Sequence, residues 1–126
     1  MNDYRIENKK LLSKDFKVDF DYNIKDIQYI DNIYIILLDI PNNVDEIDNV
    51  YGVNEKGEII WRIENPEKTF PVNKTGKPEY DNIALSVYVS INFNPDMLLT
   101  ATTFFATKYV VDYKTGKLLK KEQGRW

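Results

Sequence analysis

The chain has 126 residues, which is the size of one ordinary domain and is long enough to bury a core without disulfides. It contains no cysteine and no histidine, which excludes disulfides, thiolate metal sites and the commonest general base. A net charge of −3, from 17 basic and 20 acidic residues, is a poor fit to a nucleic-acid-binding protein.

Residues 1–22 are predicted to form a β-hairpin. Apolar and charged side chains alternate in residues 16–20, as in a half-buried strand, and Tyr4–Glu7 is the expected partner strand. Such a hairpin is suited to cover an exposed edge of a larger sheet. The same residues are polar and charged, so no signal peptide is predicted and a cytoplasmic protein is expected. The longest aliphatic run, Ile35–Leu38, is too short to cross a bilayer, and no membrane association is expected.

Residues 23–64 and 82–126 are each predicted to form four strands. Ile33–Ile40 is nearly continuous in aliphatic and β-branched residues, which is typical of a strand buried on both faces. Residues 65–81 contain three prolines and are predicted to be a linker. The expected strands, in chain order, are Lys25–Ile30, Ile33–Ile40, Asn49–Val53, Glu58–Glu64, Ala84–Ile91, Met97–Thr103, Thr107–Asp112 and Lys117–Lys121.

Two segments of the chain match one another. Val50–Asn54 followed by Gly57–Ile60 corresponds to Lys108–Asp112 followed by Gly116–Leu119. Each copy forms the last two of four predicted strands. A period of about fifty residues is typical of propeller-type blades. The sequence therefore predicts one all-β domain of two four-stranded antiparallel meanders with an N-terminal hairpin, forming a sandwich or a partial propeller.

The run Val50–Trp61 resembles the blade hairpin of quinoprotein-type (PQQ-like) β-propeller repeats. Those repeats read tyrosine, a small residue, an aliphatic residue, Asp or Asn, a turn ending at glycine, and a strand leading to tryptophan. The second copy, Tyr109–Lys120, has Lys120 at the tryptophan position. The resemblance implies blade-like local structure, with Trp61 packed within its sheet. Two blades cannot close a ring around a cofactor, so no cofactor is expected.

No catalytic constellation is found in the sequence. Nucleophile–base triads fail without histidine or cysteine, and no phosphate loop is present. The acids of Asp45–Asp48 lack the spacing and the glycine of an EF-hand, so no metal site is predicted. We therefore expect that the protein is not an enzyme. The alternative is a carboxylate-dependent hydrolase or a sugar-binding domain, because glycosidases require only two suitably placed Asp or Glu residues.

The distribution of charge and the tyrosine content favour binding of another protein. Residues 15–48 hold nine acids and two lysines, whereas residues 108–125 hold six basic residues and two acids. Nine residues are tyrosine, a type enriched at protein interfaces. We expect a small bacterial protein-interaction or immunity-like module that docks a basic partner. The candidate partner-binding residues are Asp45, Glu46, Asp48, Tyr51, Tyr109 and Tyr113.

Two other interpretations stay open at this point. Residues 15–48 can be a solvated acidic face without a function. The chain can also be a self-assembling structural unit, a homo-oligomer, because exposed edge strands and the terminal Trp126 are suited to pairing with another copy.

Overall fold

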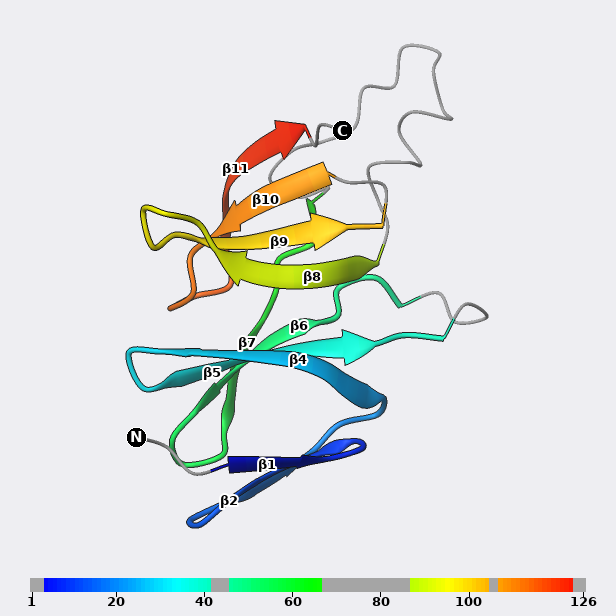
Figure 1. The fold of residues 1–126 in the computed structure, drawn as a ribbon, viewed down its shortest axis with the longest axis vertical. Coiled ribbons are helices and arrows are strands. Elements are labelled where there is room, and N and C mark those ends of the chain that lie inside the picture. The colour runs from blue at the N-terminus through cyan, green and yellow to red at the C-terminus, as the bar shows by residue number, and fades with distance from the viewer. Residues whose placement is uncertain (1–3, 42–45, 67–86, 105–106, 124–126) are drawn as a thin grey trace.

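The computed structural model describes residues 4–41, 46–66, 87–104 and 107–123, and within them the fold is all-β, as predicted. The strands form three antiparallel sheets, each with its strands in chain order (Figure 1). The first sheet contains β1 (Tyr4–Glu7), β2 (Lys10–Ser13) and β3 (Lys17–Asp19). The second contains β4 (Asn23–Ile30), β5 (Ile33–Asp39), β6 (Val50–Asn54) and β7 (Ile59–Arg62). The third contains β8 (Tyr88–Phe93), β9 (Leu99–Thr103), β10 (Thr107–Val111) and β11 (Leu118–Gln123).

The N-terminal segment forms a three-stranded sheet, and the prediction of a hairpin was wrong. β2 lies between β1 and β3 and pairs with both, so Tyr4–Glu7 does not pair with residues 16–20. Lys10–Ser13 escaped prediction because its apolar residues are two adjacent leucines, which show no alternation.

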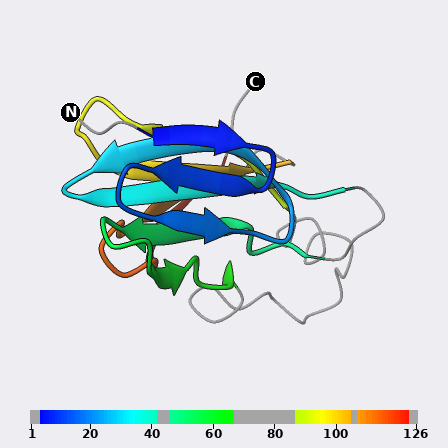
Figure 2. The same ribbon diagram turned by 90° about the horizontal axis from the view of Figure 1, so that it is seen from below.

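The first sheet covers a face of the second sheet and not an edge, which also differs from the expectation. Leu11 and Val18 share a buried cluster with Tyr34, Ile36 and Leu38 of β5. Figure 2 shows the first sheet lying across the second when the molecule is seen from below. The short first sheet thus protects the apolar surface of the middle layer from water.

β5 is buried on both faces, as its continuous apolar run predicted. Its odd-numbered side chains from Ile33 to Leu37 belong to the core shared with the third sheet. Its even-numbered side chains from Tyr34 to Leu38 belong to the core shared with the first sheet. The three sheets are therefore layers, with the second in the middle (Figure 1).

The second and third sheets carry the same irregularities at the same places. The register shifts in the first strand of each, between Ile24 and Asp26 and between Tyr88 and Ser90. A second shift falls between the third and fourth strands of each, beside Gly52 in one sheet and Val110 in the other. The repeat seen in the sequence thus extends to the backbone.

Trp61 joins the second sheet to the third. Its ring lies so close to Gly52 and Gly116 that a Cβ on either glycine would fall within 2.6 Å of a ring atom. Its Nε1 donates a hydrogen bond to the carbonyl of Tyr113 at 2.8 Å. Trp61 therefore packs on its own sheet, as expected, but also reaches the β10–β11 turn of the next. In the second copy Lys120 replaces this ring, opposite Val110.

Asn49 provides a second connection between these sheets. Its side chain is buried, and Nδ2 donates to the carbonyls of Leu38 at 2.8 Å and Tyr88 at 2.9 Å. Its Oδ1 accepts the Tyr88 N–H at 2.9 Å. Both amide hydrogens and the amide oxygen are thus used, which offsets the cost of burying a polar group.

Two turns share one hydrogen-bond pattern. In Asn54–Glu58 and in Asn94–Leu98 the asparagine Oδ1 accepts from the amides two and four residues later. The fourth residue of each turn has a left-handed backbone, with φ 81° at Gly57 and φ 63° at Met97. Glycine adopts this conformation without steric cost, whereas methionine adopts it only with backbone strain.

We expect Met97→Gly to raise the free energy of unfolding by about 0.5–1 kcal/mol, since relief of backbone strain exceeds the added entropy of the unfolded chain. Urea denaturation followed by far-UV circular dichroism measures the change. The reverse substitution at the matched position, Gly57→Met, is expected to destabilise. A lower stability of Met97→Gly would contradict the strain argument.

Candidate partner-binding site

Three of the predicted partner-binding residues lie together around Arg62 of β7. The Arg62 Nη2 is 2.8 Å from a carboxylate oxygen of Glu46, and its Nε donates to the Asp48 carbonyl at 2.7 Å. The guanidinium lies 5.4 Å from the ring centroid of Tyr51, within the range of a cation–π contact. Asn65 donates to the Asp48 carboxylate. We call these residues, Glu46, Asp48, Tyr51, Arg62 and Asn65, the Arg62 cluster.

The pKa of Tyr51 in this cluster depends on the charged groups around its side chain. Burial raises the pKa of Tyr51, and the Arg62 guanidinium opposes that shift. The carboxylates of Glu46, Asp21 and Asp48 raise the pKa further. Acids from two segments, Asp21 before β4 and the pair Glu46 and Asp48 before β6, therefore act on one side chain.

The other predicted residues lie elsewhere. Tyr109 is 1% exposed in the core between the second and third sheets, where it packs edge-on against Tyr88 and burial raises its pKa. Tyr113 lies in the β10–β11 turn, and its hydroxyl donates to Asp31 in the β4–β5 turn, which raises the pKa of Tyr113. Asp45 lies outside the described residues. Tyr109 offers no surface to a partner, and Tyr113 belongs to a different region.

Next to the Arg62 cluster is a hollow of about 470 Å³, which we call the acidic groove. The segments that line it, the β1–β2 turn, the β3–β4 connection and the end of β5, lie at the end of the first two sheets that is opposite the β4–β5 turn (Figure 1). Asp21 and Asp39 line it, and neither forms an ion pair within the described part of the chain. The full lining is Lys9, Asp21, Tyr22, Asn23, Asp39 and Pro41.

Sequence reasoning missed the acidic groove because its lining comes from three separate segments. These are the β1–β2 turn, the β3–β4 connection and the end of β5. The available signal was the placement of Asp21 just beyond the predicted strand of residues 16–20 and of Asp39 near the end of the predicted strand Ile33–Ile40. Loops that follow strands at one end of neighbouring sheets bring such side chains together.

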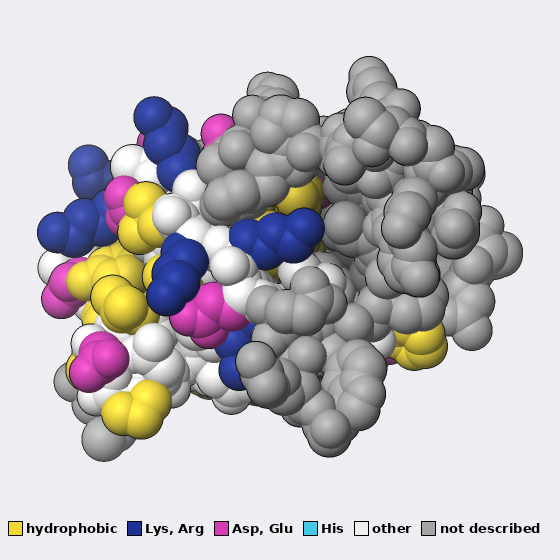
Figure 3. All heavy atoms as spheres, turned by 90° about the horizontal axis from the view of Figure 1, so that it is seen from above, with side chains coloured by type: hydrophobic (Ala, Val, Ile, Leu, Met, Phe, Trp, Pro, Cys, Tyr) yellow, Lys and Arg dark blue, Asp and Glu magenta, His cyan; other side chains and the backbone are white. Residues whose placement is uncertain are grey.

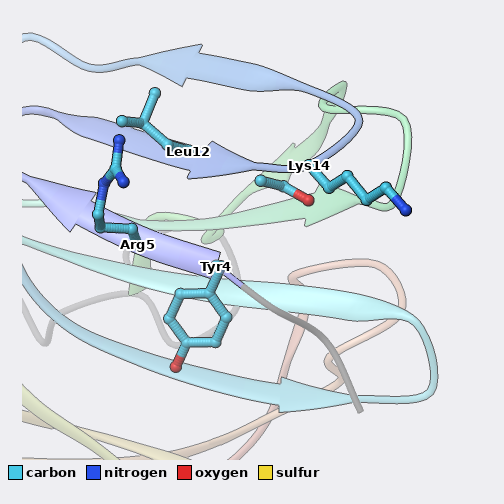
Figure 4. A pocket seen from close by; sticks show the side chains of 5 residues that line it. Tyr4, Arg5, Leu12 and Lys14 are labelled. Carbon is cyan, nitrogen blue, oxygen red and sulfur yellow. The ribbon is translucent and has the colours of Figure 1, made fainter.

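A second hollow, of about 340 Å³, lies on the first sheet and has a different character. It is lined by Tyr4, Arg5, Leu12, Ser13 and Lys14. Arg5 forms an ion pair with Glu7 at 2.8 Å, and Figure 4 shows the Lys14 side chain extending away from the other lining residues. Its charged groups do not converge on one point, so the acidic groove is the better candidate site.

Among the described residues, no three Asp or Glu side chains are placed to hold a metal ion. No helix in that same part of the chain has the length and apolarity needed to span a bilayer.

Comparison with known proteins gives a family assignment. A search of the curated proteins finds no match to the chain. The model of the family described as Domain of unknown function (DUF7957) matches residues 1–123, which include all three sheets and the lining of the acidic groove. The chain therefore belongs to the family Domain of unknown function (DUF7957).

Proposed function

We propose that the protein is a non-catalytic protein-binding module that docks a basic partner at the acidic groove and the adjoining Arg62 cluster. The observation that carries this proposal is the gathering of four carboxylates in these two features. They are those of Asp21, Asp39, Glu46 and Asp48. Among the described residues of the two features, Lys9 and Arg62 are the opposing cations. A surface of one sign steers an oppositely charged partner and rejects others.

The lining of the acidic groove suits a lysine or arginine side chain of a partner. Tyr22 and Pro41 provide apolar contact for the aliphatic part of such a side chain. Asp21 and Asp39 provide carboxylates for its charged end. Arg62 forms its ion pair with Glu46 and not with Asp21 or Asp39, so these two acids stay available to a partner.

We further propose that the second and third sheets are blade-like units of a partial propeller, as the resemblance to PQQ-like repeats implies. Their matching register shifts support this proposal. The contact of Trp61 with both sheets supports it too. A rigid stack of this kind would hold the acidic groove in one shape, which lowers the entropy lost on binding.

A specific observation also favours the sugar-binding alternative. Two carboxylates, a tyrosine and an asparagine line one groove, and such side chains bind the hydroxyls and apolar faces of sugars. The two functions differ in their response to salt, because screening weakens the docking of a charged partner and leaves the binding of a neutral sugar nearly unchanged.

The test is capture of partners from a lysate of the source organism with immobilised protein, at low and at high salt. The charge-reversal variant is Asp21→Lys/Asp39→Lys, and the matched control is Asp15→Lys/Glu58→Lys, which makes the same charge change at exposed positions away from the groove. We expect a basic protein that wild type and control retain at low salt and release at high salt. The charge-reversal variant should bind it at least about tenfold more weakly.

Equal retention by all three proteins would contradict docking at the acidic groove. Retention that high salt does not weaken would contradict a charged partner. Near-UV circular dichroism of each variant checks that the fold is retained.

A further inference from the structure

The β8–β9 turn presents two apolar side chains to solvent. Met97 is 60% exposed and Leu98 is 45% exposed. Asn94 fixes the turn, because its Oδ1 accepts the amides of Asp96 and Leu98 at 2.9 Å and its carbonyl accepts the Met97 N–H at 2.8 Å. The two apolar side chains are therefore held in place, which lowers the entropic cost of using them in a contact.

The geometry of the turn does not require these apolar residues. The β6–β7 turn has the same asparagine-based pattern, and Lys56, Gly57 and Glu58 occupy the corresponding positions. In the β8–β9 turn Met97 carries a positive φ that favours glycine. Backbone strain combined with an exposed apolar side chain is typical of a binding surface.

Lysines lie beside this turn. Phe93, which precedes Asn94, packs edge-on against Tyr113 with their ring centroids 6.5 Å apart, so the β8–β9 and β10–β11 turns are neighbours. Lys114 and Lys117 in the second of these turns are exposed, and neither forms an ion pair within the described residues. Figure 3 views the molecule from the side of the third sheet and shows lysine and arginine side chains interspersed with apolar ones.

The acids near this turn offset the positive charge of the two lysines only in part. Asp96 lies at the exposed tip of the turn itself. The Asp112 carboxylate accepts the backbone amide of Lys114, and the Asp31 carboxylate accepts the Tyr113 hydroxyl. We call Met97, Leu98, Lys114 and Lys117 the apolar-basic tip.

The acidic groove is complementary to the apolar-basic tip and lies at the opposite end of the strands (Figure 1). Its Tyr22 and Pro41 match the apolar pair. Its two carboxylates, Asp21 and Asp39, outnumber the one cation of its described lining, Lys9, and match the two lysines. A hollow of about 470 Å³ also admits side chains of the size of methionine and leucine. Two different surfaces of one molecule thus carry opposite charges and matching apolar groups.

We infer that the acidic groove of one molecule receives the apolar-basic tip of a second copy of the same chain. This inference rests on the proposed function, because it names the apolar-basic tip of a second copy as the basic surface that docks at the same groove. The two surfaces differ, so the contact is heterologous and leaves one tip and one groove free in every dimer. Further copies then add head to tail.

Sedimentation equilibrium of the full chain over a range of concentrations tests the inference. The wild-type average mass is expected to rise with concentration beyond a dimer. The tip variant Met97→Asn/Leu98→Ser and the groove variant Asp21→Lys/Asp39→Lys should each stay monomeric. Asparagine tolerates the positive φ at position 97, so the tip variant is expected to fold.

The decisive sample is a mixture of the two variants. The tip variant still has an intact groove and the groove variant still has an intact tip, so an equimolar mixture should form a dimer and nothing larger. The matched control, Ile59→Asn/Ile60→Ser, removes an apolar pair that is 49% and 43% exposed on β7 and should associate like the wild type.

Two outcomes would overturn the inference. The first is a wild-type protein that stays monomeric at all concentrations, and the second is self-association that either variant retains when alone. If the monomeric wild type binds phosphatidylserine vesicles and the tip variant loses that binding, the tip is assigned to an anionic lipid surface instead. A monomeric wild type that still captures a basic protein through the acidic groove would leave the proposed function standing.

Discussion

Gly116→Ala is expected to lower the free energy of unfolding by about 3 kcal/mol, which is a large part of the stability of an ordinary domain. Gly116 has φ 79°, a conformation that costs alanine about 1 kcal/mol. The new Cβ would also lie 2.6 Å from the Trp61 Cε3, well inside van der Waals contact. The ring cannot shift, because Gly52 bounds it on β6 and its Nε1 is bound to the Tyr113 carbonyl. Urea denaturation measures the change.

A double-mutant cycle with Trp61→Leu separates the two causes. The smaller leucine removes the clash with the new Cβ and leaves the cost of the positive φ. In the Trp61→Leu background the effect of Gly116→Ala should therefore fall to about 1 kcal/mol. The same loss in both backgrounds would show that backbone strain alone explains the effect and that the ring of Trp61 does not limit the space at Gly116.

The strands that the sequence predicted correctly have patterns set by local burial. β5 faces two cores, so its residues from Ile33 to Leu38 are continuously apolar, and the nearly continuous run Ile33–Ile40 is sufficient by itself to predict burial on both faces. β2 could not be recognised in this way, because Leu11 is buried while Leu12 beside it is only partly so. The long-range contacts of Trp61 could not be predicted either, because the spacing of residues does not identify which glycine of another sheet lies over the ring.

The candidate site was predictable only where its residues are close in the sequence. Glu46 and Asp48 were recognised as a charged loop, but the arginine that binds them, Arg62, comes from a different strand. Tyr109 was predicted to be an interface residue although it is a core residue. Tyrosine is common both in cores and at interfaces, so its residue type does not separate the two. Its neighbour Val110 is buried as well, so alternation along β10 does not identify an exposed face.

Asn49→Asp is expected to lower the free energy of unfolding by about 3–5 kcal/mol. The substitution replaces the Nδ2 group that donates to the carbonyls of Leu38 and Tyr88 with an oxygen. A buried carboxylate would then face two carbonyl oxygens, and within the described part of the chain the favourable contact left to it is the Tyr88 N–H. Because these bonds connect β5 to β8, the loss falls on the contact between the second and third sheets. Urea denaturation gives the size of the effect.

The matched control is Asn92→Asp, which makes the same chemical change on β8 at an exposed side chain and should change stability by less than about 0.5 kcal/mol. Asn49→Ala should lie between the two, at about 2–3 kcal/mol, because it leaves the same backbone groups unpaired but adds no buried charge. The order of the three variants therefore tests the hydrogen-bond geometry itself. If Asn49→Asp and Asn92→Asp were equally stable, the amide of Asn49 would not hold the two sheets together, and the stack would depend on apolar packing and on Trp61.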